Sequence, residues 1–234
     1  MDKINERIIV ALDYSNFSDM ENLVNRIGDI GVFYKVGLEL YSSCGEKALN
    51  FLKEKNKKIF LDLKFHDIPN TVAKAVKNIA HYGVEITNLH ASGGYEMMKA
   101  AQEALISEAK TTKLIAVTIL TSLNDVSLKE IGYERNLLEQ VTILAKLAER
   151  AGLAGVVCSP LEAAAIKVST SQGFLTVTPG IRFEIDSKDD QKRTLHPLEA
   201  LNGASDYIVI GRSITGAIDP VAVFEKIILA EKEF

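Results

Sequence analysis

The sequence is poor in cysteine and proline, with 2 cysteines and 5 prolines among 234 residues. Cys44 and Cys158 lie far apart, which excludes a disulfide-rich scaffold and any zinc site built from several cysteines. No apolar run reaches the roughly 18 residues that a membrane-spanning helix requires. Charged residues near the start stand where a secretion signal has its apolar stretch. We therefore expect a soluble cytoplasmic protein.

The sequence also lacks a strong charge of either sign. Its 27 Lys and Arg residues against 31 Asp and Glu give a formal net charge of −4, so the surface as a whole does not attract nucleic acid or an anionic membrane. No Pro-, Gly- or Ser-rich segment and no block of charge divides the chain. Residues 1–234 are therefore expected to form one domain.

The sequence repeats one pattern, in which a short apolar run is followed by a longer segment whose apolar residues have the spacing of a helix. The apolar runs cover 7–13, 32–38, 58–64, 85–91, 113–120, 155–160, 174–180 and 207–212. They are almost continuously apolar, as parallel strands covered on both faces are. Eight such units of about 29 residues favour a (β/α)₈ TIM barrel. An open doubly wound sheet has the same order of elements and is the alternative.

Charged residues interrupt the first three runs near their ends, where a TIM barrel has its active face. Asp13 ends the first run, Lys35 interrupts the second, and Asp62 and Lys64 both lie in the third. A spacing of two places Asp62 and Lys64 on the same face of a strand. Because unpaired buried charges are costly to desolvate, we expect these four side chains to neutralise one another as an alternating network. Either the network is catalytic or it is a salt-bridge layer that plugs the barrel.

The segment DLKFHDIPNT at 62–71 closely resembles the signature of the bacterial-type orotidine 5′-phosphate decarboxylase family. The resemblance extends along essentially the whole chain. It includes VALD ending in Asp13, YKVGLEL around Lys35, NLHASGG at 88–94, AVTILTS ending at Ser122, TPGIR ending at Arg182, DDQKR containing Gln191, and IVIGRSIT around Gly211. A lone D-x-K-x-x-D also occurs in related sugar-phosphate enzymes, so the ten-residue run carries most of the specificity.

The resemblance implies a homodimeric barrel that decarboxylates orotidine 5′-monophosphate to uridine 5′-monophosphate, the last step of de novo pyrimidine synthesis. It implies no cofactor and no metal. By this resemblance Lys64 is the proton donor, and Asp62, Lys35 and Asp67 complete the catalytic array.

The resemblance also implies the residues that bind the substrate. Asp67, Ile68 and Thr71 are expected to reach the active site of the other subunit. The full set is Asp13, Lys35, Asp62, Leu63, Lys64, Phe65, His66, Asp67, Ile68, Pro69, Asn70, Thr71, Thr121, Ser122, Pro179, Arg182, Gln191, Gly211 and Arg212.

An ammonium group at Lys64 suits this chemistry. Loss of carbon dioxide leaves a carbanion in the plane of the pyrimidine ring, which the π system does not readily delocalise, and no cofactor acts as an electron sink. A fixed ammonium stabilises that charge and can deliver the replacing proton. Two unit charges about 4 Å apart interact by roughly 4 kcal/mol at an effective dielectric of 20, or about three orders of magnitude in rate. One lysine therefore supplies only part of the acceleration.

Two segments fit phosphate binding and closure. Gly211 and Arg212 follow the last apolar run, where many TIM barrels bind phosphate, although an ordinary turn would have the same sequence. Arg182 and Gln191 belong to a long polar loop, 182–194, which is either a lid over the substrate or a surface loop. Thr121 ends the fifth run and, with Ser122, could hydrogen-bond the pyrimidine.

Two other functions stay open from the residues alone. One is a magnesium-dependent sugar-phosphate decarboxylase or aldolase on the same fold, and the other is a non-catalytic nucleotide-binding dimer. Dinucleotide-binding and Walker motifs are absent, and the four histidines show no metal-ligand spacing.

Overall fold

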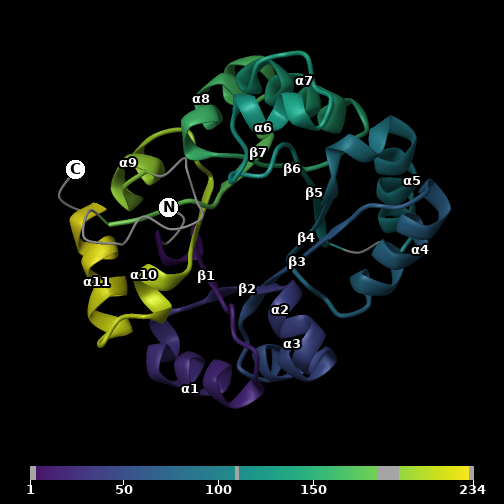
Figure 1. The fold of residues 1–234 in the computed structure, drawn as a ribbon. Coiled ribbons are helices and arrows are strands. Elements are labelled where there is room, and N and C mark those ends of the chain that lie inside the picture. Colours follow the sequence, from purple (N-terminus) through teal and green to yellow (C-terminus); the bar gives the residue numbers. More distant parts are fainter. Residues whose placement is uncertain (1–3, 109–110, 184–194, 232–234) are drawn as a thin grey trace.

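The computed structural model describes residues 4–108, 111–183 and 195–231, and in these residues parallel strands close into a barrel in chain order (Figure 1). β1 pairs with both β2 and β8, which closes the ring. The strands are β1 (Ile8–Ala11), β2 (Phe33–Gly37), β3 (Lys58–Phe65), β4 (Ile86–His90), β5 (Lys113–Val117), β6 (Gly155–Val157), β7 (Leu175–Thr178) and β8 (Tyr207–Ile210). The closed barrel confirms the predicted (β/α)₈ fold and rules out the open sheet.

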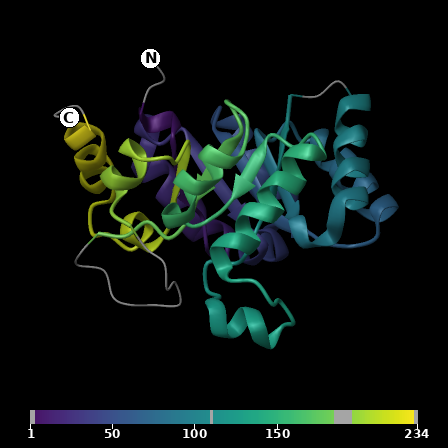
Figure 2. The same cartoon turned by 90° about the horizontal axis from the view of Figure 1, so that it is seen from above.

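Helices surround the barrel as an outer ring (Figure 1). They are α1 (Phe17–Ile27), α2 (Leu38–Cys44), α3 (Glu46–Glu54), α4 (Pro69–Ala80), α5 (Gly94–Ser107), α6 (Asp125–Glu130), α7 (Leu137–Arg150), α8 (Pro160–Ser169), α9 (Pro197–Asn202), α10 (Arg212–Thr215) and α11 (Pro220–Glu231), with 3₁₀ turns at Ile4–Glu6, Gly28–Ile30 and Ala91–Gly93. The short helices α2, α6 and α10 were not predicted. Figure 2 shows α6 projecting from the ring. Within the described residues, no helix is long and apolar enough to cross a membrane.

Several strands are shorter than the apolar runs that predicted them. The run 155–160 contains only the three residues of β6, because Ser159 leaves the sheet to cap α8. Its hydroxyl and the Glu162 carboxylate form a capping box, and Pro160 takes the first helical position. The run 113–120 likewise ends as a strand at Val117, so Thr121 lies in the following loop and not at a strand end.

The barrel interior is filled by side chains from successive strands. They are Ile9, Ala11, Phe33, Phe60, Ile86, Ile115, Val177 and Val209. Phe60 is 1% exposed, and burying a side chain of this size contributes roughly 1.5–3 kcal/mol to folding. This apolar layer closes the middle of the barrel and forms a floor beneath its C-terminal end.

Ion pairs and backbone contacts tie together the N-terminal ends of the strands. Lys58 Nζ lies 2.7 Å from Glu6 Oε2, and Lys167 Nζ lies 2.6 Å from Asp206 Oδ2. Arg7, just before β1, donates to backbone carbonyls ahead of β8. Each of these cations has a carboxylate or carbonyl acceptor within hydrogen-bond distance, so this end of the barrel is held closed by its own polar groups.

Candidate active site

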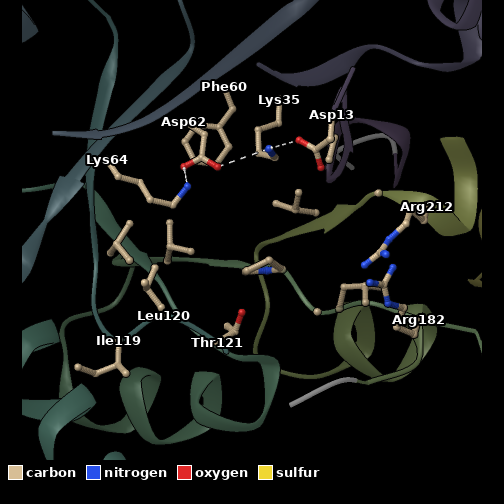
Figure 3. A pocket seen from close by; sticks show the side chains of 18 residues that line it. Asp13, Lys35, Phe60, Asp62, Lys64, Ile119, Leu120, Thr121, Arg182 and Arg212 are labelled. Carbon is tan, nitrogen blue, oxygen red and sulfur yellow. Dashed lines mark hydrogen bonds and ion pairs between the residues drawn. The ribbon is translucent and has the colours of Figure 1, made fainter. Parts of the chain in front are cut away.

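A cavity of about 260 Å³ opens at the C-terminal ends of the strands (Figure 3). Its lining combines charged groups with apolar residues of the barrel floor. The lining residues are Ala11, Asp13, Lys35, Phe60, Asp62, Lys64, Val117, Ile119, Leu120, Thr121, Val157, Pro179, Gly180, Ile181, Arg182, Val209, Gly211 and Arg212. The lining therefore has four cationic side chains and two carboxylates, which makes the cavity a favourable site for an anion.

The four charges predicted from the first three apolar runs meet along one wall of this cavity (Figure 3). Lys35 Nζ lies 3.0 Å from Asp13 Oδ1 and 3.5 Å from Asp62 Oδ2. Lys64 Nζ lies 2.7 Å from Asp62 Oδ1. The signs alternate along the series Asp13, Lys35, Asp62, Lys64, as expected, and we call this series the charged array.

The charged array keeps its inner members ionised. Burial alone would raise the pKa of Asp62, but the Lys35 and Lys64 ammonium groups and the hydrogen bonds from Lys64 and Asn88 outweigh it, so the pKa is lowered. Burial alone would lower the pKa of Lys35, but the carboxylates of Asp62 and Asp13 outweigh it, so that pKa is raised. Asp62 therefore remains a carboxylate and Lys35 an ammonium across the neutral range.

Lys64 occupies an irregular part of β3. Its φ of 53° is in the left-handed region, which is uncommon for a residue with a side chain. The pairing of β3 with β4 shifts register between Leu61 and Phe65, so β3 is irregular here. The simple alternation of a strand predicted that Lys64 and Asp62 would share a face. They do meet in the cavity, but through this bend in the backbone.

Two uncharged residues beside the charged array were not predicted. Asn88 on β4 is fully buried and hydrogen-bonds both the Asp62 carboxylate and the Lys64 backbone N–H. Gly37 ends β2, and a Cβ added there would lie 2.8 Å from Lys35 Nζ, so a larger residue would displace that ammonium. Neither is charged, so the charges that interrupt the apolar runs do not indicate them. The signal for Asn88 was a polar amide within an apolar run.

Two arginines lie across the cavity from Lys64. Arg182 follows β7 and Arg212 follows β8, and both guanidinium groups point into the cavity in Figure 3. Pro179, which follows β7, and Gly211, which follows β8, line the same cavity. The cavity thus has an arginine end and a lysine end.

Most of the signature segment lies outside the cavity of this single chain. The residues from 66 to 71 are all exposed, and Ile68 has 67% of its surface accessible. The Asp67 carboxylate accepts a hydrogen bond from the Ile68 backbone N–H, and Asp67 does not line the cavity. Pro69 begins α4, with Asn70 and Thr71 in its first turn. Leu63 and Phe65 pack against the hydrophobic core.

The remaining predicted binding residues fall in different places. Thr121 lines the cavity, whereas Ser122 is exposed and does not line it. His66 stacks near His90, with ring centroids 5.4 Å apart, and burial together with His66 and Lys64 lowers the pKa of His90. Gln191 and nearly all of the loop 182–194 lie outside the described residues.

The described residues contain no group of three His, Cys, Asp or Glu side chains arranged to hold a metal ion. The two carboxylates in the cavity, Asp13 and Asp62, both face the Lys35 ammonium. That ammonium already supplies the positive charge that a divalent cation would bring to the pair.

The sequence is similar to those of several known proteins. Residues 6–227 match the model of the Orotidine 5′-phosphate decarboxylase / HUMPS family. The orotidine 5′-phosphate decarboxylase of Idiomarina loihiensis is 49% identical over 222 residues, which cover 95% of this chain and 96% of the relative. That of Geobacter metallireducens is 44% identical over 230 residues, covering 97% and 96%. The crystal structure of the Lactobacillus acidophilus orotidine 5′-phosphate decarboxylase superimposes with a TM-score of 0.84 at 41% identity, covering 96% of this chain and 98% of the other.

Proposed function

The chain belongs to the orotidine 5′-phosphate decarboxylase / HUMPS family, and from this premise we propose that it converts orotidine 5′-monophosphate to uridine 5′-monophosphate and carbon dioxide in pyrimidine biosynthesis. The observation that carries the proposal is the Lys64 ammonium, 2.7 Å from Asp62, at one end of a cavity whose other end has two arginines. The substrate carries a carboxylate and a phosphate at opposite ends. The cavity offers cations for both.

In the proposed reaction the bond between the pyrimidine ring and its carboxylate breaks, and the electron pair stays on the ring carbon. Carbon dioxide leaves, and Lys64 Nζ donates the proton that forms the new C–H bond. Lys64 then regains a proton from solvent. The residues supply this chemistry with no cofactor and no metal, because the ammonium both stabilises the carbanion and protonates it.

Asp62 has two parts in the proposal. It holds the Lys64 ammonium in place, and it faces the substrate carboxylate, so the departure of neutral carbon dioxide relieves a repulsion. Lys35 pairs with Asp62 on its other side, and in this proposal Lys35 and Asp13 contact the ribose. The charged array is then a prepared electrostatic environment for a charge that appears only during the reaction.

The arginine end of the cavity binds the phosphate in this proposal. Arg182 and Arg212 offer forked donors that suit phosphate oxygens, and Gly211 allows close approach of the backbone. Thr121 also lines the cavity, and in this proposal it hydrogen-bonds the pyrimidine. Binding at the phosphate, remote from the reacting carbon, supports orientation at the lysine end.

We also propose that the active protein is a cytoplasmic homodimer in which residues 1–234 act as one catalytic domain. The exposed segment 66–71 lies directly after the strand that carries Asp62 and Lys64. Its exposed Ile68 and its neighbouring Asp67 suit a contact with a second subunit. Asp67, Ile68 and Thr71 would then complete the partner's site.

Ultraviolet absorbance of orotidine 5′-monophosphate, measured with the wild-type chain in excess EDTA, tests the proposed function. Turnover in EDTA supports it. Activity only on sugar phosphates, restored by magnesium, would instead indicate a metal-dependent sugar-phosphate enzyme. Nucleotide binding without turnover would indicate a binding protein. Lys64→Ala protein purified in the same way controls for contaminating host enzyme.

A mixing experiment tests the shared site. Asp62→Ala and Asp67→Ala proteins, each inactive alone, should regain activity when their subunits exchange, because one site of the hybrid dimer is then intact. A mixture of Asp62→Ala with Lys64→Ala is the matched control and should stay inactive, because both residues belong to the same side of the site. Confirmed exchange without recovery would contradict the shared site.

A further inference from the structure

Asn88 joins two parts of the proposed site through a single amide group. Its Nδ2 donates to Asp62 Oδ1 at 2.7 Å, and its Oδ1 accepts from the Lys64 backbone N–H at 2.8 Å. Asn88 lies on β4 and is fully buried. It shares the inward face with Ile86, two residues earlier, which belongs to the barrel interior. Asn88 does not line the cavity, so it has no direct contact with a ligand there.

The backbone of Lys64 needs a partner of this kind. The register shift interrupts the pairing of β3 with β4 between Leu61 and Phe65. The Lys64 N–H therefore points to a side-chain acceptor on β4, the Asn88 amide oxygen. The same residue has a φ of 53°, a conformation that persists in a residue with a Cβ only where the surroundings hold it. The hydrogen bond from the Lys64 backbone N–H to Asn88 is one of the contacts that maintain this conformation.

The carboxylate of Asp62 is oriented by the same amide. Asp62 Oδ1 accepts from both Lys64 Nζ and Asn88 Nδ2, each at 2.7 Å, while Oδ2 faces Lys35 Nζ at 3.5 Å. Donors on both sides fix the plane of the carboxylate, which in turn sets where the Lys64 ammonium lies. Asn88 thus acts on Lys64 in two ways, through the Lys64 backbone N–H and through Asp62, the counter-ion of Lys64.

We propose that Asn88 is a positioning residue for the reaction, which holds the Lys64 ammonium at the reacting carbon by fixing both the bent backbone of Lys64 and the carboxylate of Asp62. This inference rests on the proposed function and deepens it. The partners settle the orientation of the amide, because a backbone N–H only donates and a carboxylate only accepts. A residue here must therefore supply a donor and an acceptor at once.

The role of Asn88 has a signature in the pH dependence. Burial raises the pKa of Asp62, and the amide of Asn88 is one of the groups that lower it again, together with Lys35 and Lys64. His90 on β4 also interacts with Asp62, and Asp13 lies beyond Lys35. Removal of the Asn88 amide leaves these groups in place but takes away one donor. The acid limb of kcat should then move to higher pH.

The test compares Asn88→Ala and Asn88→Asp with a matched control, Thr87→Val. Thr87 is the preceding residue of β4, is also fully buried, and donates its hydroxyl proton to the Leu61 carbonyl at 3.1 Å. Asn88→Ala should lower kcat about 10- to 100-fold, the size of effect found when the hydrogen-bond partner of a metal ligand is removed, with KM changed less than about threefold. The acid limb of kcat in Asn88→Ala should move to higher pH. Thr87→Val should lower the melting temperature but leave kcat and the acid limb as in the wild type.

Asn88→Asp separates the two contacts and gives a second variant if Asn88→Ala does not fold. Its side chain still accepts from Lys64 but places a second carboxylate against Asp62, so the acid limb should move further than in Asn88→Ala. Hydrogen exchange reports the other contact without any assay of activity. The Lys64 amide should exchange faster in Asn88→Ala and at the wild-type rate in Asn88→Asp and Thr87→Val.

The outcomes separate the two proposals. Wild-type kcat, acid limb and Lys64 exchange in Asn88→Ala would overturn the inference and leave the proposed function standing. An equal loss of kcat in Thr87→Val would also overturn it, because Asn88 would then contribute only to stability. If the wild type does not turn over orotidine 5′-monophosphate, the proposed function fails. In that case, unaltered exchange of the Lys64 amide in Asn88→Ala would also reject the proposed positioning of the Lys64 backbone by Asn88.

Discussion

The two ends of the barrel use the same kinds of side chain for different purposes. At the N-terminal end, Lys58 and Lys167 each pair with one carboxylate, and the pairs bridge neighbouring elements. At the C-terminal end, Lys35 and Lys64 share the buried Asp62 and face a cavity. Charges that satisfy one another hold the fold together. Charges that converge on a cavity are available to a ligand. Substitutions at the C-terminal end should therefore impair activity, and substitutions at the N-terminal end should impair stability.

The largest expected effect is at Lys64. In Lys64→Ala, kcat should fall by at least about three orders of magnitude, the equivalent of roughly 4 kcal/mol of lost electrostatic stabilisation. The melting temperature should change little, because Asp62 keeps Lys35 and Asn88 as partners. Steady-state kinetics and thermal unfolding on the same preparation measure both. A near-normal rate would remove Lys64 from the proposed chemistry.

Arg212 should show the next largest effect, of a different kind. Arg212→Ala removes one of the two guanidinium groups at the arginine end of the cavity. We expect KM to rise about 100-fold, or nearly 3 kcal/mol, through the loss of charge-assisted hydrogen bonds to phosphate. Inorganic phosphate should also inhibit the variant less than the wild type. An unchanged KM would contradict the phosphate role.

At the N-terminal end the effect should appear in stability. Lys167 Nζ donates to the Phe174 carbonyl and to Asp206, and Asp206 also accepts from the Thr176 backbone N–H. Because this pair is partly exposed, Lys167→Met should cost only about 1–2 kcal/mol, or a few degrees in melting temperature. The kcat should stay within about twofold of wild type. A large loss of kcat without a loss of stability in Lys167→Met would contradict the proposed difference between the two ends of the barrel.

The smallest effect should come from the exposed pair at the same end. Lys58 and Glu6 have 43% and 40% of their side-chain surfaces exposed. Lys58→Gln should change the free energy of unfolding by less than about 1 kcal/mol and should leave kcat unaltered, because solvent and salt screen such pairs. Urea unfolding at low and high salt measures this difference. It should shrink as salt is added.

Sequence patterns predicted the barrel and all four members of the charged array because both rest on local composition. Continuous apolar runs indicated parallel strands, and charges within those runs stood out as costly unless paired. The bend at Lys64 could not be predicted in this way, since period-2 alternation assumes a regular strand. Asn88 was missed because an uncharged amide carries no such cost once hydrogen-bonded.

The short helices show a second limit. α6 has a capping signal, because the Asn124 side chain accepts from the Ser127 backbone N–H, but its six residues are too few for a helical period to be read. α2 begins at Leu38, directly at the end of β2, where the apolar run 32–38 reads as continuous strand. The proposed contribution of Asp67 to a partner's site was implied only by the family resemblance, because apolar and charge patterns within one chain do not indicate a second subunit.

The bend in β3 also matters for anyone who wishes to transplant this motif. A designer who copies Asp62 and Lys64 onto a straight strand of another barrel would reproduce the letters of the motif without its geometry. The irregular backbone and the amide reaching across from the adjacent strand would have to be carried over with them. The smallest portable unit is thus a pair of neighbouring strands.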